Sequence, residues 1–139
     1  MIRSKCEDIL REHDFKVTQP RCDVLGTLSK VQHPLSVSDI VKKLGKTSPN
    51  IVTVYRILES FVEKGLVKRI QLHAGEAMFE FAGFGDHHHI ICVRCDKIEE
   101  FDTCGVSGVL KNVLKKSRQF KIITQHTFEL FGLCKVCAK

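Results

Sequence analysis

Apolar residues recur at every third or fourth position through the first 64 residues of the chain, and this spacing predicts amphipathic helices. The second helix is expected to begin at Thr18, which can cap it, with Pro20 in the first turn. A short linker at residues 46–49 separates the last two helices. The predicted helices cover residues 3–14, 18–31, 36–45 and 50–64.

After these helices, the spacing of apolar residues changes to the period of two that is typical of strands. Residues 66–72 and 77–81 are predicted to form two strands, joined by a Gly-containing turn at residues 73–76. Helices that pack on such a hairpin predict a winged helix-turn-helix domain over residues 1–81. The Gly-containing segment 82–86 is expected to be a flexible hinge.

The rest of the chain, residues 87–139, is expected to form a small α/β domain, so the predicted fold class is α+β. With fewer than 60 residues, this domain would bury little surface and would need an additional stabilising element. Its predicted elements are a strand at 87–92, a strand at 97–101, a helix at about 106–118 and a strand at about 121–131.

Two Cys-x-x-Cys pairs, Cys92/Cys95 and Cys134/Cys137, lie 38 residues apart in this second half. Four thiolates at such spacing can form a closed tetrahedral shell around Zn²⁺, which is typical of a structural site. A single pair would also suit redox chemistry, and two disulfides are an alternative that needs an oxidising compartment. The N-terminal residues lack the apolar run of a secretion signal, so we expect a cytoplasmic protein with a zinc site.

Three cysteines lie outside these pairs. Cys6 and Cys22 fall on predicted helices and are expected to be small buried hydrophobic residues. Cys104 is expected to be more exposed, and a reactive thiol there is a weaker alternative.

The composition is that of a globular protein, with 43% hydrophobic and 27% charged residues among 139. The net charge of +6 is compatible with nucleic-acid binding, but it is shared equally between residues 1–82 and 83–139. A DNA-binding surface must therefore arise from the placement of basic residues. No apolar run approaches the length of a membrane span, so no membrane partner is expected.

Several motifs together resemble those of the ferric uptake regulator family, in the same order along nearly the whole chain. They are Val17-Thr-Gln-Pro-Arg21, Thr53-Val-Tyr-Arg56, Phe79-Glu-Phe81, Asp86-His-His-His-Ile-Ile-Cys92, Cys95, Glu99-Glu-Phe101 and Gly132-Leu-Cys134. The resemblance implies a homodimeric, non-enzymatic repressor with a winged-helix domain and a small α/β dimerisation domain. Such a repressor binds a palindromic operator in double-stranded DNA and senses Fe²⁺, Zn²⁺, Mn²⁺, Ni²⁺ or peroxide.

A regulatory metal site is expected beside the zinc site. Strand alternation places His87 and His89 on one face, and the resemblance adds His33, Glu80 and Glu100 as further ligands. Without a thiolate, this set suits Fe²⁺, Mn²⁺, Co²⁺ or Zn²⁺. Taken singly, His33 also fits a helix-end cap, and Glu80 an exposed strand residue.

Fe²⁺ is the favoured regulatory metal, with Mn²⁺ or Zn²⁺ as alternatives, and control of metal-uptake genes is the expected role. Zinc-sensing relatives often carry a cysteine near the second wing strand, where this chain has Phe79-Glu80-Phe81. Peroxide-sensing relatives tend to have aspartate at the position of Glu100. These single-residue differences leave peroxide, zinc and manganese sensing open.

A candidate additional metal site uses the opposite face of the histidine strand, with Asp86, His88 and His126. Ser107 stands where iron-sensing relatives supply a glutamate, and His88 replaces a common aspartate. The site is therefore expected to be weak or altered, and His126 fits equally well as a partly buried strand residue.

The fourth predicted helix is expected to read DNA in the major groove, as the second helix of a helix-turn-helix does. The resemblance implies that Tyr55 contacts thymine methyl groups and that Arg56 contacts a base or a phosphate. Core packing is the alternative for Tyr55. The full set of DNA-binding candidates is Lys16, Arg21, Asn50, Thr53, Tyr55 and Arg56.

Two functions outside the family are alternatives to this hypothesis. A zinc deaminase needs His-x-Glu followed by Pro-Cys-x-x-Cys, but His73 and Glu76 are separated by two residues and Ile91 precedes Cys92. A zinc-ribbon interaction module without sensing remains as an alternative, but it leaves the winged-helix half unexplained.

Overall fold

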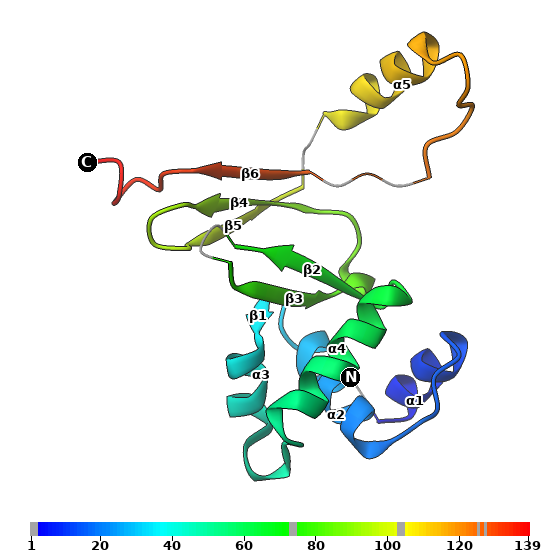
Figure 1. Ribbon diagram of the computed structural model, residues 1–139, viewed down its shortest axis with the longest axis vertical. Helices are drawn as coiled ribbons and strands as arrows, with labels where there is room; N and C mark the ends of the chain where they lie inside the picture. Colours follow the sequence, from blue (N-terminus) through cyan, green and yellow to red (C-terminus); the bar gives the residue numbers. More distant parts are fainter. Residues whose placement is uncertain (1–2, 73–74, 103–104, 125, 127) are drawn as a thin grey trace. The chain divides into compact units, whose positions relative to one another are not determined.

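The computed structural model describes residues 3–72, 75–102, 105–124, 126 and 128–139. These residues divide into two compact units, Met1–Gly85 and Asp86–Lys139 (Figure 1). No helix in the described ranges is long and apolar enough to cross a membrane. The turn expected at residues 73–76 falls partly, and Cys104 wholly, outside the described residues.

The first unit combines four helices with a small sheet, as the apolar pattern predicts, and its described elements have the following bounds. They are α1 (Arg3–Glu12), α2 (Gln19–Ser29), β1 (Leu35–Ser36), α3 (Val37–Leu44), α4 (Ile51–Glu63), β2 (Val67–Gln71) and β3 (Ala77–Phe81), with short 3₁₀ helices η1 (Gly45–Thr47) and η2 (Ala82–Phe84). The 3₁₀ helix η1 occupies part of the segment expected to be a linker. The two-residue strand β1 was not predicted.

Side-chain caps determine where two of these helices begin. Ser36 and Asp39 form a reciprocal capping box at the start of α3. The side chain of Asn50 accepts a hydrogen bond from the Thr53 N–H and caps α4. Thr18 occupies the N-cap position of α2 and Pro20 lies in its first turn, as expected, but the Thr18 side chain makes no capping hydrogen bond.

Three antiparallel strands in the order β1-β3-β2 adjoin the helices of this unit (Figure 1). Gly65, with φ of +72°, ends the turn after α4 in a left-handed conformation that glycine adopts without strain and so directs the chain into β2. The core lies between helices and sheet, where Leu25, Phe61 and Phe79 are almost fully buried. This unit therefore has a hydrophobic core of its own.

The second unit consists of β4 (His88–Cys92), β5 (Ile98–Phe101), α5 (Val106–Lys116) and β6 (Glu129–Gly132). The strand order is β5-β4-β6, with β5 antiparallel and β6 parallel to β4. The strand expected at residues 121–131 is shorter than predicted. The five-residue β4 pairs with β6 only from His89–Glu129 to Cys92–Gly132, and the apolar side chain of Ile122 is 70% exposed.

Little of the second unit is buried. Its described buried hydrophobic residues are Ile91 and Cys92, and α5 buries none of its side chains. Val109 is 59% exposed and Phe120 is 70% exposed. The unit therefore lacks an extended hydrophobic core of its own, as its small size predicts.

Candidate metal centres and nucleic-acid interface

The two Cys-x-x-Cys pairs converge at one end of the β5-β4-β6 sheet. One sulfur atom from each of Cys92, Cys95, Cys134 and Cys137 lies within 4.8 Å of the other three. Tetrahedral Zn²⁺ with bonds of about 2.3 Å requires sulfur atoms about 3.8 Å apart. The Sγ atoms of Cys95 and Cys134 are 3.7 Å apart, so the four thiols fit a zinc ion.

Main-chain conformation supports this arrangement of sulfur atoms. Asp96 has φ of +58°, a left-handed conformation that aspartate tolerates, and its N–H donates to the Cys92 carbonyl at 2.9 Å. Asp96 therefore adopts the turn conformation that glycine most readily adopts.

The four thiols differ in acidity. Hydrogen bonds from the backbone N–H groups of Cys134, Cys95 and Arg94 lower the pKa of Cys92 to about 6. The hydrogen bond with Cys134 and burial raise the pKa of Cys137 to about 12. Neutral solution therefore ionises some but not all of these thiols, and a metal ion must displace the remaining protons.

A second cluster of ligand atoms arises from the register of β4 and β5. His89 lies directly opposite Glu100, and such cross-strand neighbours share one face of an antiparallel pair. His87 precedes His89 by two positions, and their rings are 4.9 Å apart between centroids. One ligand atom from each of the three residues lies within 4.8 Å of the other two. Two imidazoles and a carboxylate can hold a divalent transition metal.

His33 and Glu80, the other expected regulatory ligands, belong to the first unit. His33 is exposed in the segment between α2 and β1, and α2 already ends at Ser29, so His33 is not a helix cap. Glu80 lies in β3 and is only 1% exposed, so its alternative interpretation as an exposed strand residue is wrong. A ligand role for both remains a prediction.

His88 occupies an aromatic environment within the second unit. It is 7% exposed, and its ring lies 5.7 Å from Phe101 and 5.5 Å from Phe128, between centroids. Its Nδ1 atom is 3.2 Å from the Phe128 carbonyl oxygen. His88 therefore packs as part of this unit's small interior.

His126 approaches His88, with 5.4 Å between their ring centroids. His126 is exposed and lies outside any strand, so its alternative interpretation as a buried strand residue is wrong. Asp86 is also exposed. The additional metal site on these three residues remains a prediction.

The N-terminal half of α4 exposes an apolar surface. Ile51, Val52 and Tyr55 are 50%, 53% and 47% exposed, and they are the exposed large hydrophobic residues in the described part of the first unit. Val54, on the opposite side of α4, is fully buried. Tyr55 therefore does not belong to the core, and this surface is available to contact DNA.

The other candidate DNA-binding residues lie on α4, on α2 and in the loop before α2. Arg56 and Lys16 are exposed, and Thr53 is partly buried in the first turn of α4. Arg21 donates a hydrogen bond to the Lys16 carbonyl at 2.7 Å, and its guanidinium lies 5.2 Å from the centre of the Phe15 ring. Arg21 therefore fixes the backbone that carries Lys16.

Comparison with known proteins identifies the family. The model of the ferric uptake regulator family matches residues 12–131. The chain belongs to the ferric uptake regulator family. Proteins of this family are transcription regulators rather than enzymes, and they bind DNA and respond to metals.

Individual relatives align with almost the whole chain. The ferric uptake regulation protein of Legionella pneumophila is 32% identical over 131 residues, covering 92% of this chain and 95% of that protein. The peroxide operon regulator of Bacillus subtilis is 33% identical over 135 residues, covering 95% and 90% respectively. The solved structure of the Helicobacter pylori ferric uptake regulator Fur matches with a TM-score of 0.81 at 25% identity, covering 100% of this chain and 95% of that one.

These matches confirm the α+β fold, with an N-terminal winged-helix DNA-binding domain and a C-terminal domain of the dimerisation type. They do not distinguish iron from peroxide sensing, since relatives of both names match at similar identity. The four-cysteine cluster fits the zinc site of such a regulator.

Cys6 and Cys22 are expected to be unreactive in the folded regulator. Cys6 is 3% exposed, its thiol donates to the Cys22 carbonyl at 3.4 Å, and burial raises its pKa to about 11. At pH 8 about one thousandth of Cys6 would be the reactive thiolate. Mass spectrometry after iodoacetamide treatment should therefore find Cys6 and Cys22 unmodified before, and modified after, unfolding in urea. Rapid modification of Cys6 in the folded protein would contradict this placement.

Proposed function

We propose that this regulator is an Fe²⁺-responsive repressor of metal-uptake genes that acts in the cytoplasm as a homodimer on a palindromic operator. The observation that carries the proposal is the grouping of His87, His89 and Glu100, which lack a thiolate and are separate from the four cysteines. Imidazole and carboxylate ligands suit Fe²⁺ and Mn²⁺, whereas a four-cysteine shell suits structural Zn²⁺.

We propose that Glu80 and His33 complete the regulatory site. Both belong to the unit that carries the reading helix, whereas the His87, His89 and Glu100 ligands belong to the other unit. A metal bound by residues of both units would favour one orientation of the DNA-binding unit. A dimer must present its two reading helices about one DNA turn apart, so this restriction affects operator affinity. The coupling for such an effector is typically about 1–3 kcal/mol.

The homodimer is proposed from the apolar surface of the second unit. Val109, Val113 and Phe120 are more than half exposed, on or just after a helix that buries no side chain. Exposed apolar side chains of this kind, when they gather on one surface, commonly mark a protein interface. A symmetric partner would cover the same residues on both chains.

The exposed surface of α4 supports the DNA-reading role. An apolar side chain in the major groove can contact the methyl group of thymine, and an arginine can donate to guanine or to phosphate. Tyr55 supplies the first kind of contact and Arg56 the second. Lys16 and Arg21, on the loop and helix before the motif, are proposed to contact the DNA backbone.

Substitution of Tyr55 by alanine is expected to weaken operator binding by about 5- to 150-fold, since a good base contact contributes about 1–3 kcal/mol. The dependence of affinity on salt should change little, because no charge is lost. Lys16→Ala should instead reduce the slope of log affinity against log salt concentration by about one. Glu63→Gln, at the other end of α4, is the control. Fluorescence anisotropy over a salt series measures both quantities, and unchanged affinity in Tyr55→Ala would contradict the assigned reading surface.

Peroxide sensing is the alternative that a specific observation favours, namely the similarity to the peroxide operon regulator of Bacillus subtilis. The deciding experiment loads the protein anaerobically with Fe²⁺, Mn²⁺ or Zn²⁺ and measures binding to a palindromic duplex selected from a randomised pool. Iron sensing is supported when Fe²⁺ activates DNA binding most strongly and when binding returns on addition of fresh Fe²⁺ after a brief treatment with hydrogen peroxide. Irreversible loss of binding after peroxide supports the alternative.

A further inference from the structure

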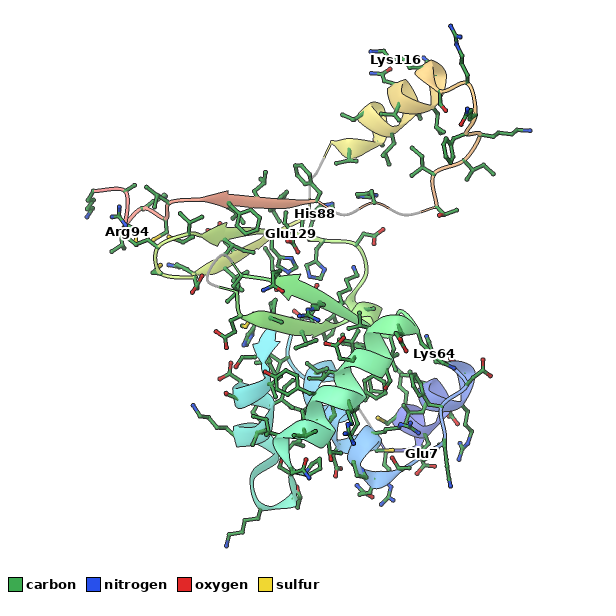
Figure 2. All side chains as sticks on the ribbon, viewed as in Figure 1. Glu7, Lys64, His88, Arg94, Lys116 and Glu129 are labelled. Atoms are coloured by element: carbon green, nitrogen blue, oxygen red, sulfur yellow. The ribbon has the colours of Figure 1, made fainter. Side chains whose placement is uncertain are left out.

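Arg94 lies between the two cysteines of the first pair and contacts the second pair directly. Its Nη1 atom donates a hydrogen bond to the Cys137 carbonyl oxygen at 2.6 Å. The two residues are 43 positions apart in the chain. Figure 2 shows Arg94 at the end of the β5-β4-β6 sheet near the C-terminus. A guanidinium donor forms a shorter and stronger hydrogen bond than a neutral donor does.

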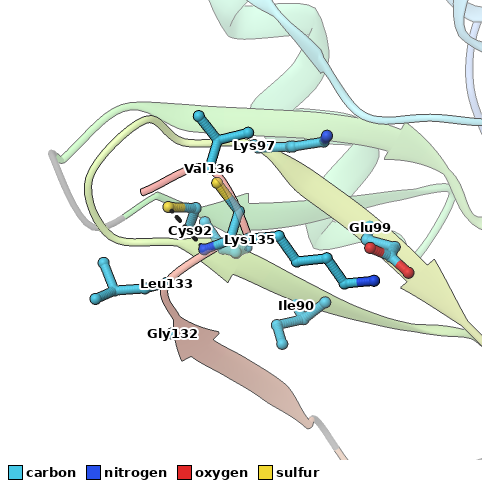
Figure 3. Close-up of a pocket in the computed structure, with 10 residues that line it drawn as sticks. Ile90, Cys92, Lys97, Glu99, Gly132, Leu133, Lys135 and Val136 are labelled. Carbon is cyan, nitrogen blue, oxygen red and sulfur yellow. Dashed lines mark hydrogen bonds between the residues drawn. The ribbon is translucent and has the colours of Figure 1, made fainter. Parts of the chain in front are cut away.

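Strand pairing already fixes one side of the four-cysteine cluster. Cys92 lies opposite Gly132 at the end of the β4–β6 ladder, and the Val93 N–H donates to the Gly132 carbonyl at 2.9 Å. The Cys134 N–H donates to the Cys92 sulfur at 3.4 Å (Figure 3). The β4–β6 pairing therefore brings Cys92 and Cys134 together in the folded unit.

Cys137 lies beyond the end of β6, in a turn in which the Ala138 N–H donates to the Cys134 carbonyl. The Arg94 hydrogen bond joins this turn to the first cysteine pair. We propose that Arg94 is a positioning residue that holds the second cysteine pair closed against the first and thereby slows release of the metal. This inference rests on the proposed zinc site, and it concerns how that site is kept closed.

Positive charge near the thiolates is a separate effect that must be distinguished from the hydrogen bond. Lys97 and Lys135 line a cavity of about 400 Å³ beside Cys92 and Cys134 (Figure 3). Either lysine can offset the negative charge of four thiolates. Lys135→Met therefore removes a neighbouring charge and leaves the Arg94 hydrogen bond intact, which makes it the matched control.

The test is the rate at which zinc passes from the purified full-length protein to an excess of a chromogenic chelator at pH 7.5. Arg94→Met should release zinc about 10- to 100-fold faster than wild type, since loss of a residue that orients metal ligands typically lowers metal affinity by about that factor and the loss is expected in the release rate. Arg94→Lys, which keeps the charge without the forked donor, should be intermediate. Lys135→Met should release zinc at close to the wild-type rate. Zinc content before the chelator is added should be one ion per chain in all four proteins.

Wild-type release rates in both Arg94→Met and Arg94→Lys would overturn the inference. Equal acceleration in Lys135→Met and Arg94→Met would also overturn it, since charge alone would then explain the effect. If Arg94→Met does not fold, Arg94→Lys and Lys135→Met still provide the comparison. A wild-type protein without zinc would instead refute the zinc assignment itself, so the two failures are distinguishable.

Discussion

Replacement of Cys92 by serine is expected to abolish zinc binding and to unfold the C-terminal unit while the N-terminal unit stays folded. The described part of the second unit buries only Ile91 and Cys92 among its hydrophobic residues, so metal binding must contribute much of its stability. Structural zinc contributes about 10–16 kcal/mol of apparent binding free energy in small zinc domains. The first unit keeps the core around Phe61 and Phe79, which the substitution does not touch.

This prediction is tested on one preparation by metal analysis for zinc content, calorimetry for thermal transitions and sedimentation for the dimer. Cys92→Ser should lack zinc in the four-cysteine site, should lose one thermal transition and should sediment largely as a monomer, because the unit proposed to form the dimer is unfolded. Cys104→Ser, a cysteine of the same half that lies outside the two pairs, is the control and should keep its zinc. One zinc per chain and an intact dimer in Cys92→Ser would refute the four-cysteine assignment.

Replacement of Glu100 by glutamine is expected to remove most of the metal dependence of DNA binding without loss of zinc. Glu100 lies opposite His89 and has a carboxylate oxygen within 4.8 Å of the His87 and His89 ligand atoms. An amide is a weaker ligand than a carboxylate for these metals, so the proposed coupling of about 1–3 kcal/mol, or about 5- to 150-fold in affinity, should be largely lost.

Glu99 provides a closely matched control for this prediction. It precedes Glu100 in β5, is also exposed, and lies opposite Ile90, so its side chain points to the other face of the sheet. Glu99→Gln removes the same charge and should respond to metal as wild type does. Glutamine at position 100 is preferable to alanine at His89, because His89 is only 4% exposed and its truncation would disturb packing. An equal effect of the two glutamine variants would contradict a ligand role for Glu100.

Helical periodicity was sufficient to predict which side of α4 is exposed. The pattern of buried Val54, Ile57 and Phe61 leaves Tyr55 on the opposite side of α4, and the structure exposes it. Strand alternation likewise predicted that His87 and His89 share a face opposite to His88, and the His87 and His89 rings do lie 4.9 Å apart, although β4 begins at His88 rather than at His87. These predictions depend only on local geometry, which the sequence determines directly.

Other features depend on contacts between distant segments and could not be read from local patterns. The four residues of β6 are those that pair with His89–Cys92 of β4, and this pairing is a contact between distant segments. The burial of Glu80 contradicts the usual exposure of a charged strand residue, and a tertiary environment must cause it. The contact between Arg94 and Cys137 joins residues 43 positions apart, and no spacing rule indicates it. Asn50 was expected among the DNA contacts, and the structure shows that its side-chain oxygen also caps α4.

We propose that metal sensing and structural zinc binding occupy different residues of one regulator. The most direct test measures operator affinity of the wild-type protein against free Fe²⁺ under anaerobic conditions, with zinc content assayed on the same samples. We expect affinity to rise by about 5- to 150-fold with Fe²⁺ and to fall again on mild chelation, while zinc stays at one ion per chain. Affinity that does not respond to Fe²⁺, or that changes only as zinc is gained or lost, would contradict it.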